Sequence, residues 1–136
     1  MSSGRLVVNV DGGARGNPGP AAIAAVVARP DGEPVEERSE TIGPATNNVA
    51  EYRALLLGIE RARALGAREV ELVGDSELIV RQVRGEYRVK DASLRDLHGR
   101  VREALADFDD WSIRHVRRED NELADALVNE ALDAAD

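Results

Sequence analysis

The chain has 136 residues, of which 43% are hydrophobic and 32% charged, and its formal net charge at pH 7 is −8. This size suits one domain that buries its own core, and no apolar run reaches the roughly 20 residues of a membrane helix. The absence of cysteine excludes disulfides and thiolate metal sites. No secretory signal is recognisable, so we expect a cytoplasmic protein without a membrane partner.

The acidity of the chain bears on its partners. Most nucleic-acid binders carry a basic footprint, whereas acidic residues outnumber Lys and Arg here by 26 to 18. The basic residues are nevertheless clustered, in segments 81–90 and 114–118. An acidic balance lowers the expected affinity for nucleic acid but permits a local basic groove.

The first third of the chain predicts three antiparallel strands, because apolar runs are separated by short turn segments. The expected strands are residues 5–11, 21–28 and 35–42. Gly and Pro fill the first connection, and Pro30-Asp31-Gly32 marks the second.

Helical and strand segments alternate in the remaining part of the chain. We expect helices at residues 48–65, 76–84, 93–107 and 121–134, and strands at 69–73 and 111–116. Gly66 is expected to end the first helix and Ser93 to cap the third. The order βββαβααβα predicts one α/β domain over residues 1–136. Its five-stranded mixed sheet has three antiparallel strands, then two parallel ones, with helices on both faces.

Four acidic residues lie where a fold alone gives little reason for them. Asp11 and Asp75 each follow an apolar strand segment, and Glu51 and Asp125 lie early in two helices. In mixed sheets, ligands gather beyond the carboxyl ends of parallel strands. Converging carboxylates repel one another unless a cation lies between them, and hard divalent cations prefer oxygen ligands. The sequence therefore predicts a Mg²⁺-dependent enzyme that acts on phosphate esters.

Each acidic residue also has an ordinary structural explanation. Glu51 lies on the apolar arc of its helix, where a bare charge is costly, but an acid near a helix start also complements the helix dipole. The dipole explanation holds for Asp125 as well. Asp75 is a candidate N-cap and Asp11 a candidate turn residue. The predicted metal site therefore depends on all four residues occurring together.

Two loop segments are candidates for contact with a substrate. Residues 11–20, DGGARGNPGP, join two strands and match neither the dinucleotide nor the P-loop pattern. Their glycines permit close approach of a nucleic-acid backbone, and Asn17 offers hydrogen bonds; a tight hairpin is the alternative. Thr46 and Asn47 either cap the first helix or contact phosphates and base edges.

Taken together, these residues resemble the ribonuclease H type 1 family. The similarity is ordered and covers nearly the whole chain, in the segments Val10-Asp11-Gly12-Gly13, Gly16-Asn17-Pro18-Gly19-Pro20, Thr46-Asn47-Asn48-Val49-Ala50-Glu51, Gly74-Asp75-Ser76 and Asn121-Glu122-Leu123-Ala124-Asp125. The resemblance implies a ribonuclease H-like fold. It also implies hydrolysis of the RNA strand of RNA/DNA hybrids, which leaves 5′-phosphate and 3′-hydroxyl ends.

The resemblance also implies roles for particular residues. Two Mg²⁺ ions, which Mn²⁺ can replace, would be held around the scissile phosphate by Asp11, Glu51, Asp75 and Asp125. The implied substrate contacts are Gly12, Gly13, Asn17, Thr46 and Asn47.

The chain departs from the family pattern in two places. Many members carry a catalytic histidine in the loop before the last helix, but the corresponding residues 117–120 contain none. We interpret His115 as a strand side chain, with proton transfer during product release as the alternative, and His98 as a solvated surface residue. Many members also insert a lysine-rich handle; here we expect Arg88 and Lys90, in a short basic segment, to contact the hybrid.

Three other functions remain open at this point. The chain could be a non-catalytic nucleic-acid-binding domain of the same fold, although the presence of all four acidic residues argues against this. It could also be a nuclease for another structured nucleic acid, or a small-molecule phosphohydrolase. We expect a monomer, and the domain is either free-standing or one module of a longer protein.

Overall fold

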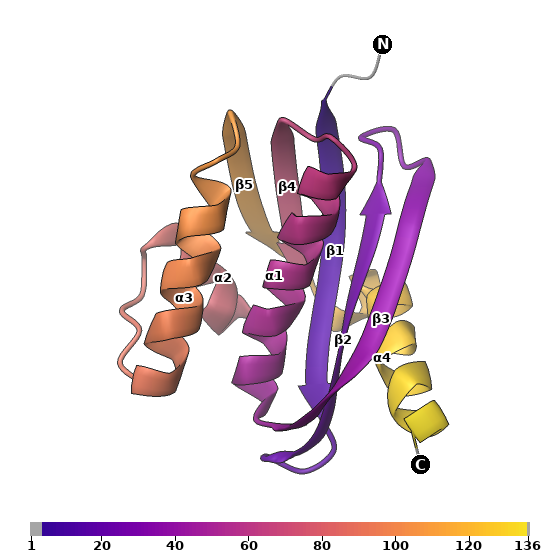
Figure 1. Ribbon diagram of the computed structural model, residues 1–136, viewed down its shortest axis with the longest axis vertical. Helices are drawn as coiled ribbons and strands as arrows, with labels where there is room; N and C mark the ends of the chain where they lie inside the picture. Colours follow the sequence, from indigo (N-terminus) through magenta and orange to yellow (C-terminus); the bar gives the residue numbers. More distant parts are fainter. Residues whose placement is uncertain (1–3, 136) are drawn as a thin grey trace.

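The computed structural model describes residues 4–135, in which five strands form one mixed sheet in the order β3-β2-β1-β4-β5 (Figure 1). The strands are β1 (Arg5–Ala14), β2 (Gly19–Ala28), β3 (Pro34–Ala45), β4 (Glu69–Gly74) and β5 (Asp110–His115). The first three pair antiparallel, and β4 joins β1 and β5 in parallel. The predicted sheet is confirmed.

Four α-helices lie on the two faces of this sheet. They are α1 (Asn47–Ala64), α2 (Glu77–Arg84), α3 (Ala92–Leu105) and α4 (Glu122–Ala135), with a short 3₁₀ helix, η1 (Arg118–Asp120), before α4. Helices α1 and α3 cover one face, whereas α4 packs across β2 and β3 on the other (Figure 1). Within residues 4–135, no helix has both the length and the apolar character needed to cross a bilayer.

The core is divided between these two faces. Val8 and Val10 of β1 point toward α1 and belong to the larger cluster of buried side chains. On the opposite face, Ala22 and Ala24 of β2 contact Val128 and other residues of α4. Since strand side chains alternate between faces, Asn9 and Asp11 point to the α4 side. Asp11 and α4 are thereby brought to the same face.

Two glycines allow α1 to lie unusually close to β1. A Cβ atom on Gly58 would lie 2.8 Å from Val10 Cγ1, and one on Gly12 would lie 2.3 Å from the backbone oxygen of Ala50. Both distances are too short for a real side chain, so a larger residue would displace the valine side chains at Gly58 and the backbone of α1 or β1 at Gly12. This close packing places Glu51, the neighbour of Ala50, at the level of the sheet.

Two predicted boundaries were wrong for identifiable reasons. Strand β1 continues to Ala14: its parallel pairing with β4 ends at Asn9, but its antiparallel pairing with β2 runs on. Asp11 therefore lies within a strand instead of at its end. Helix α3 is capped by Asp91, not Ser93, because Asp91 Oδ1 accepts a hydrogen bond from the Ser93 N–H at 2.8 Å. Gly66 follows α1 with a φ of +88°, as predicted.

The prediction that His98 is a solvated surface residue was also wrong. Its ring is partly buried, lies edge-on to Tyr52 with the ring centroids 6.3 Å apart, and has Nε2 2.9 Å from the Gln82 backbone oxygen. The Tyr52 hydroxyl in turn donates to Gln82 Oε1 at 2.6 Å. These contacts join α1, α2 and α3, and no residue pattern within α3 indicated that His98 faces the interior.

Candidate active site

The four acidic residues converge from four different elements of the fold. Asp11 lies on β1, Glu51 in the second turn of α1, Asp75 directly after β4 and Asp125 in the first turn of α4. Each of the other three carboxylates is close enough to act electrostatically on Asp11, and Asp125 lies within hydrogen-bonding reach of it. The structure thus brings together all four residues that the sequence singled out.

The environment of Asp11 strongly disfavours its charged form. Burial raises the pKa of Asp11 from 3.8 to about 8, with further contributions from Asp75, Asp125 and Glu51. A partly buried carboxyl surrounded by three others keeps a proton at neutral pH unless a cation takes its place. The charge distribution is therefore that of a site suited to divalent cations.

Glu51 lies in a similar setting with partial compensation. Burial raises the pKa of Glu51 to about 7; a hydrogen bond from Ser76 and the charge of Arg118 oppose this rise, and Asp75 adds to it. Ser76 also caps α2, where its hydroxyl oxygen accepts from the Ile79 N–H at 3.3 Å. Because Ser76 is the N-cap, the alternative role of Asp75 as cap does not apply.

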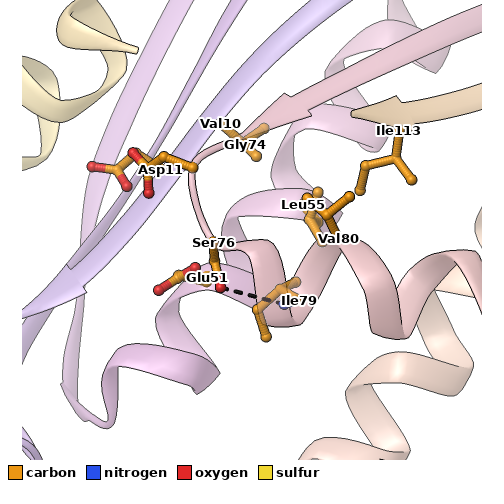
Figure 2. Close-up of a pocket in the computed structure, with 10 residues that line it drawn as sticks. Val10, Asp11, Glu51, Leu55, Gly74, Ser76, Ile79, Val80 and Ile113 are labelled. Atoms are coloured by element: carbon orange, nitrogen blue, oxygen red, sulfur yellow. Dashed lines mark hydrogen bonds between the residues drawn. The ribbon is translucent and has the colours of Figure 1, made fainter. Parts of the chain in front are cut away.

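A small cavity lies beneath the carboxylates. Asp11, Glu51 and Asp75 form its polar side, and its apolar side includes Leu55 and Ile79 (Figure 2). Its volume of about 20 Å³ suffices for one water molecule. This apolar floor explains why burial is the largest cause of the raised pKa values of Asp11 and Glu51.

The donor set fits divalent metal ions in one particular way. In residues 4–135, no three Asp, Glu, His or Cys side chains are close enough to form a complete metal-binding group by themselves. Mg²⁺ does not require such a group, since it keeps several waters and is commonly held by one or two carboxylates together with substrate phosphates. Four coupled carboxylates therefore fit ions that are shared between protein and substrate.

Asn121 is a polar residue of the site to which the sequence analysis gave no role. It precedes α4, is 2% exposed, and its side-chain amide donates to Asp75 Oδ2 at 3.2 Å. Its place at the start of a helix predicts only capping. Ser76 and Arg118, which act on Glu51, were likewise missed, since their contacts arise from tertiary structure.

The two predicted substrate loops are fastened to each other. Asn17 Oδ1 accepts from the Asn47 N–H at 3.0 Å, and Asn47 Oδ1 accepts from the Ala14 N–H at 2.8 Å. Thr46 is the N-cap of α1, as one of its two predicted roles requires. Gly12 is buried against α1, and Gly13 is partly exposed beside Asn47. Substrate contact by these five residues stays a prediction.

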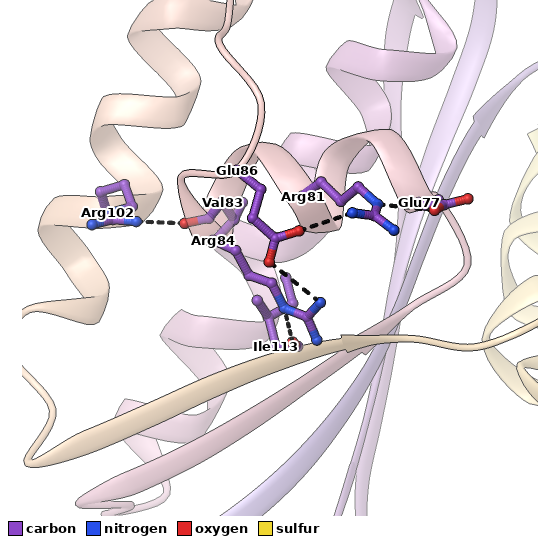
Figure 3. Close-up of polar contacts among 7 residues, drawn as sticks. All are labelled: Glu77, Arg81, Val83, Arg84, Glu86, Arg102 and Ile113. Atoms are coloured by element: carbon purple, nitrogen blue, oxygen red, sulfur yellow. Dashed lines mark hydrogen bonds and ion pairs between the residues drawn. The ribbon is translucent and has the colours of Figure 1, made fainter.

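The basic residues of segment 81–90, which covers the end of α2 and the loop after it, separate into paired and unpaired cations. Arg81 donates to Glu77 and Glu86 at 2.9 and 3.1 Å, and Arg84 donates to the Ile113 carbonyl at 3.0 Å (Figure 3). By contrast, Arg88 and Lys90 are exposed, and neither forms an ion pair with any described residue. Together with Val89 and Arg95 they line a hollow on the surface.

His115 ends β5, as the strand interpretation predicted. It is exposed and is paired in the sheet with Gly74, the residue before Asp75. A role in proton transfer stays a prediction.

Comparison with known proteins establishes the family. A family model described as Reverse transcriptase-like matches residues 9–131. The Ribonuclease HI of Halobacterium salinarum is 52% identical over 132 residues, which cover 97% of this chain and 66% of that protein. The crystal structure of RNase H1 from this archaeon aligns with a TM-score of 0.94 at 51% identity, covering 96% of this chain and 98% of that one. This chain belongs to the ribonuclease H type 1 family.

Another ribonuclease H structure contains nucleic acid. LC11-RNase H1 in complex with RNA/DNA hybrid aligns with a TM-score of 0.91 at 42% identity, over 96% of this chain and 98% of that chain. The predicted ribonuclease H-like fold and family resemblance are thereby confirmed.

A further relative is a longer protein. Bifunctional protein Rv2228c of Mycobacterium tuberculosis is 43% identical over 132 residues, which cover 96% of this chain but 36% of the relative. Its matching part has been solved as an N-terminal RNase H domain. This chain thus spans 66% of the Halobacterium relative and 36% of the mycobacterial one; its own fusion to another domain stays a prediction.

Proposed function

We propose that this ribonuclease H domain is a metal-dependent endonuclease that hydrolyses the RNA strand of RNA/DNA hybrids, leaving 5′-phosphate and 3′-hydroxyl ends. The observation that carries the proposal is the convergence of three carboxylates on a fourth, that of Asp11, whose pKa is raised to about 8 by burial and by these three neighbours. A fold has no need of such a costly cluster, whereas phosphodiester hydrolysis with divalent metals does.

The residues of such a site would have different roles. Asp11, Glu51, Asp75 and Asp125 would hold two Mg²⁺ ions, or Mn²⁺ in their place. When bound, these ions supply activation of a water molecule and stabilisation of the leaving oxygen. Ser76 and Arg118 both favour the charged form of Glu51, Ser76 through a hydrogen bond and Arg118 through its positive charge, and so lower the pKa of that carboxyl.

Hybrid as the substrate is supported by two observations. LC11-RNase H1 has been solved with RNA/DNA hybrid and has the same fold as this chain. Arg88 and Lys90 are cations that no described carboxylate neutralises, in a chain whose net charge is −8. Such residues are free to pair with phosphates.

The substrate class is tested by cleavage of end-labelled RNA/DNA hybrid, RNA duplex and DNA duplex, resolved on gels with Mg²⁺, Mn²⁺ or EDTA. We expect cutting of the RNA strand of the hybrid alone, in either metal and not in EDTA. Cutting of another duplex at a similar rate would identify a nuclease with a different substrate. Tight hybrid binding without any cleavage would identify a binding domain of the same fold.

Three further expectations belong to this proposal. We infer that the domain acts as a monomer in the cytoplasm and requires no membrane partner. The monomer is tested by sedimentation of the purified protein, alone and with an RNA/DNA hybrid just long enough for one protein molecule. A dimer would double the sedimenting mass of the protein in both samples.

A further inference from the structure

Asn121 is an exception to the apolar character of the interior. Among the described residues, the buried polar or charged ones are Gln82 and Asn121, which are 5% and 2% exposed. A buried amide without partners costs about 1–3 kcal/mol, and no buried side-chain nitrogen or oxygen in residues 4–135 lacks one. The partners of Asn121 are therefore what explains its presence.

The Asn121 side chain forms three hydrogen bonds, one of them to a carboxylate of the site. Nδ2 donates to the Val10 carbonyl at 2.9 Å and to Asp75 Oδ2 at 3.2 Å, and Oδ1 accepts from Asn9 Nδ2 at 3.0 Å. Both amide hydrogens are used by oxygen acceptors, so a flipped amide would set oxygen against oxygen. The orientation of the Asn121 amide is thus fixed by its surroundings.

The backbone of Asn121 extends this connection to α4. Its carbonyl accepts a hydrogen bond from the Asp125 N–H at 3.1 Å. Asn121 therefore bonds to Asp75 and to Val10, the neighbour of Asp11, through its side chain, and to the backbone of Asp125 through its own carbonyl. Three of the four carboxylates have their positions related through Asn121.

We propose that Asn121 is a positioning residue of the metal centre, which holds the Asp75 carboxylate in the orientation that divalent metal binding requires. The proposal rests on the function proposed above, because it needs the carboxylates to bind metal. Hydrogen-bonding partners of metal ligands typically change metal affinity or activity ten- to hundredfold. A loss of that size is the expected effect of removing the Asn121 amide.

The test compares Asn121→Leu with Gln82→Leu. Each change replaces a buried amide by an apolar side chain, but Gln82 bonds to Tyr52 and His98 and touches no carboxylate of the site. Mg²⁺ affinity is measured by calorimetry on the protein without nucleic acid. The values of kcat and KM are measured on an RNA/DNA hybrid, at a temperature well below the melting temperature of each protein variant. We expect Asn121→Leu to lose Mg²⁺ affinity and kcat ten- to hundredfold with KM changed less than threefold. Gln82→Leu is expected to lose thermal stability only.

Several outcomes would overturn the proposal. Unchanged Mg²⁺ affinity in Asn121→Leu would do so, as would equal losses in the two variants. If Asn121→Leu does not fold, Asn9→Ala decides the matter, because it removes only the hydrogen bond that Asn121 Oδ1 accepts from Asn9. A threefold or larger loss of Mg²⁺ affinity in Asn9→Ala supports the proposal, and no loss overturns it. Failure of the unaltered protein to cleave the hybrid in Mg²⁺ would instead refute the proposed function.

Discussion

The carboxyl groups of Asp11 and Asp125, from the first strand and the last helix, lie within hydrogen-bonding reach of each other. Two carboxyl groups can share a hydrogen bond only when one of them keeps its proton. Burial and this neighbour both raise the pKa of Asp11, which reaches about 8. Without metal, repulsion among these carboxyl groups therefore destabilises the folded state where β1 lies beside α4.

Replacing Asp11 by Asn should stabilise the metal-free protein while it abolishes cleavage. The amide removes one buried negative charge, so we expect the free energy of unfolding at alkaline pH in EDTA to rise by roughly 1–3 kcal/mol. Thermal unfolding followed by circular dichroism measures the change. Asp96→Asn, on the exposed surface of α3, is the control and should leave both stability and cleavage unchanged; a less stable Asp11→Asn protein would contradict the account.

The metal-free protein should become less stable as the pH rises from acidic to alkaline. The folded-state pKa values of Asp11 and Glu51, about 8 and about 7, lie above their ordinary values of 3.8 and 4.5. Stability from such groups is complete below the ordinary pKa and is lost as the pH rises through the folded-state value. Melting temperatures in EDTA at a series of pH values test this.

Mg²⁺ should reverse the loss of stability at higher pH, because the ion competes with protons for the same carboxyl groups. We expect the rise in melting temperature caused by Mg²⁺ to grow between about pH 6 and 8 and to be smaller in Asp11→Asn. A rise of the same size at every pH would show that Mg²⁺ acts elsewhere.

The sequence predicted much of this arrangement, and its failures have physical causes. Asp11, Glu51, Asp75 and Asp125 were identifiable because they occur together, two directly after apolar strand segments and two early in helices. Asn121 was not, because an asparagine before a helix is already explained as a cap. His98 was misplaced since the packing of α3 against α1 is decided by tertiary contacts that a single helix does not encode.

Gly12→Ala should damage both the fold and the site. The added methyl would lie 2.3 Å from the Ala50 backbone oxygen, so α1 must move and carry Glu51 away. Overpacking of this kind costs about 1–3 kcal/mol, and we expect lower melting temperature together with lower kcat. The matched control is Gly99→Ala on α3, where nothing lies within 4 Å; it should be neutral or stabilising by up to about 1 kcal/mol. Equal effects in the two variants would refute the packing explanation.

Arg88→Ala/Lys90→Ala should weaken binding of the hybrid and reduce its dependence on salt. Loss of two phosphate contacts is expected to reduce the slope of log K against log salt by roughly 1.4–1.8. Arg63→Ala/Arg68→Ala removes the same charge, but these arginines pair with Asp107 and Asp109, so the slope should not change. Fluorescence anisotropy in EDTA at several salt concentrations distinguishes the two. An unchanged slope in Arg88→Ala/Lys90→Ala would exclude these residues from the interface.

The most direct test of the central claim is cleavage of one end-labelled RNA/DNA hybrid by the unaltered protein and by Asp75→Asn, each in Mg²⁺ and in EDTA. We expect the unaltered protein to cut the RNA strand in Mg²⁺ and not in EDTA, and Asp75→Asn to lose at least a hundredfold in cleavage while it still binds the hybrid. Cleavage that persists in Asp75→Asn, or in EDTA, would show that the carboxylates do not form the catalytic centre.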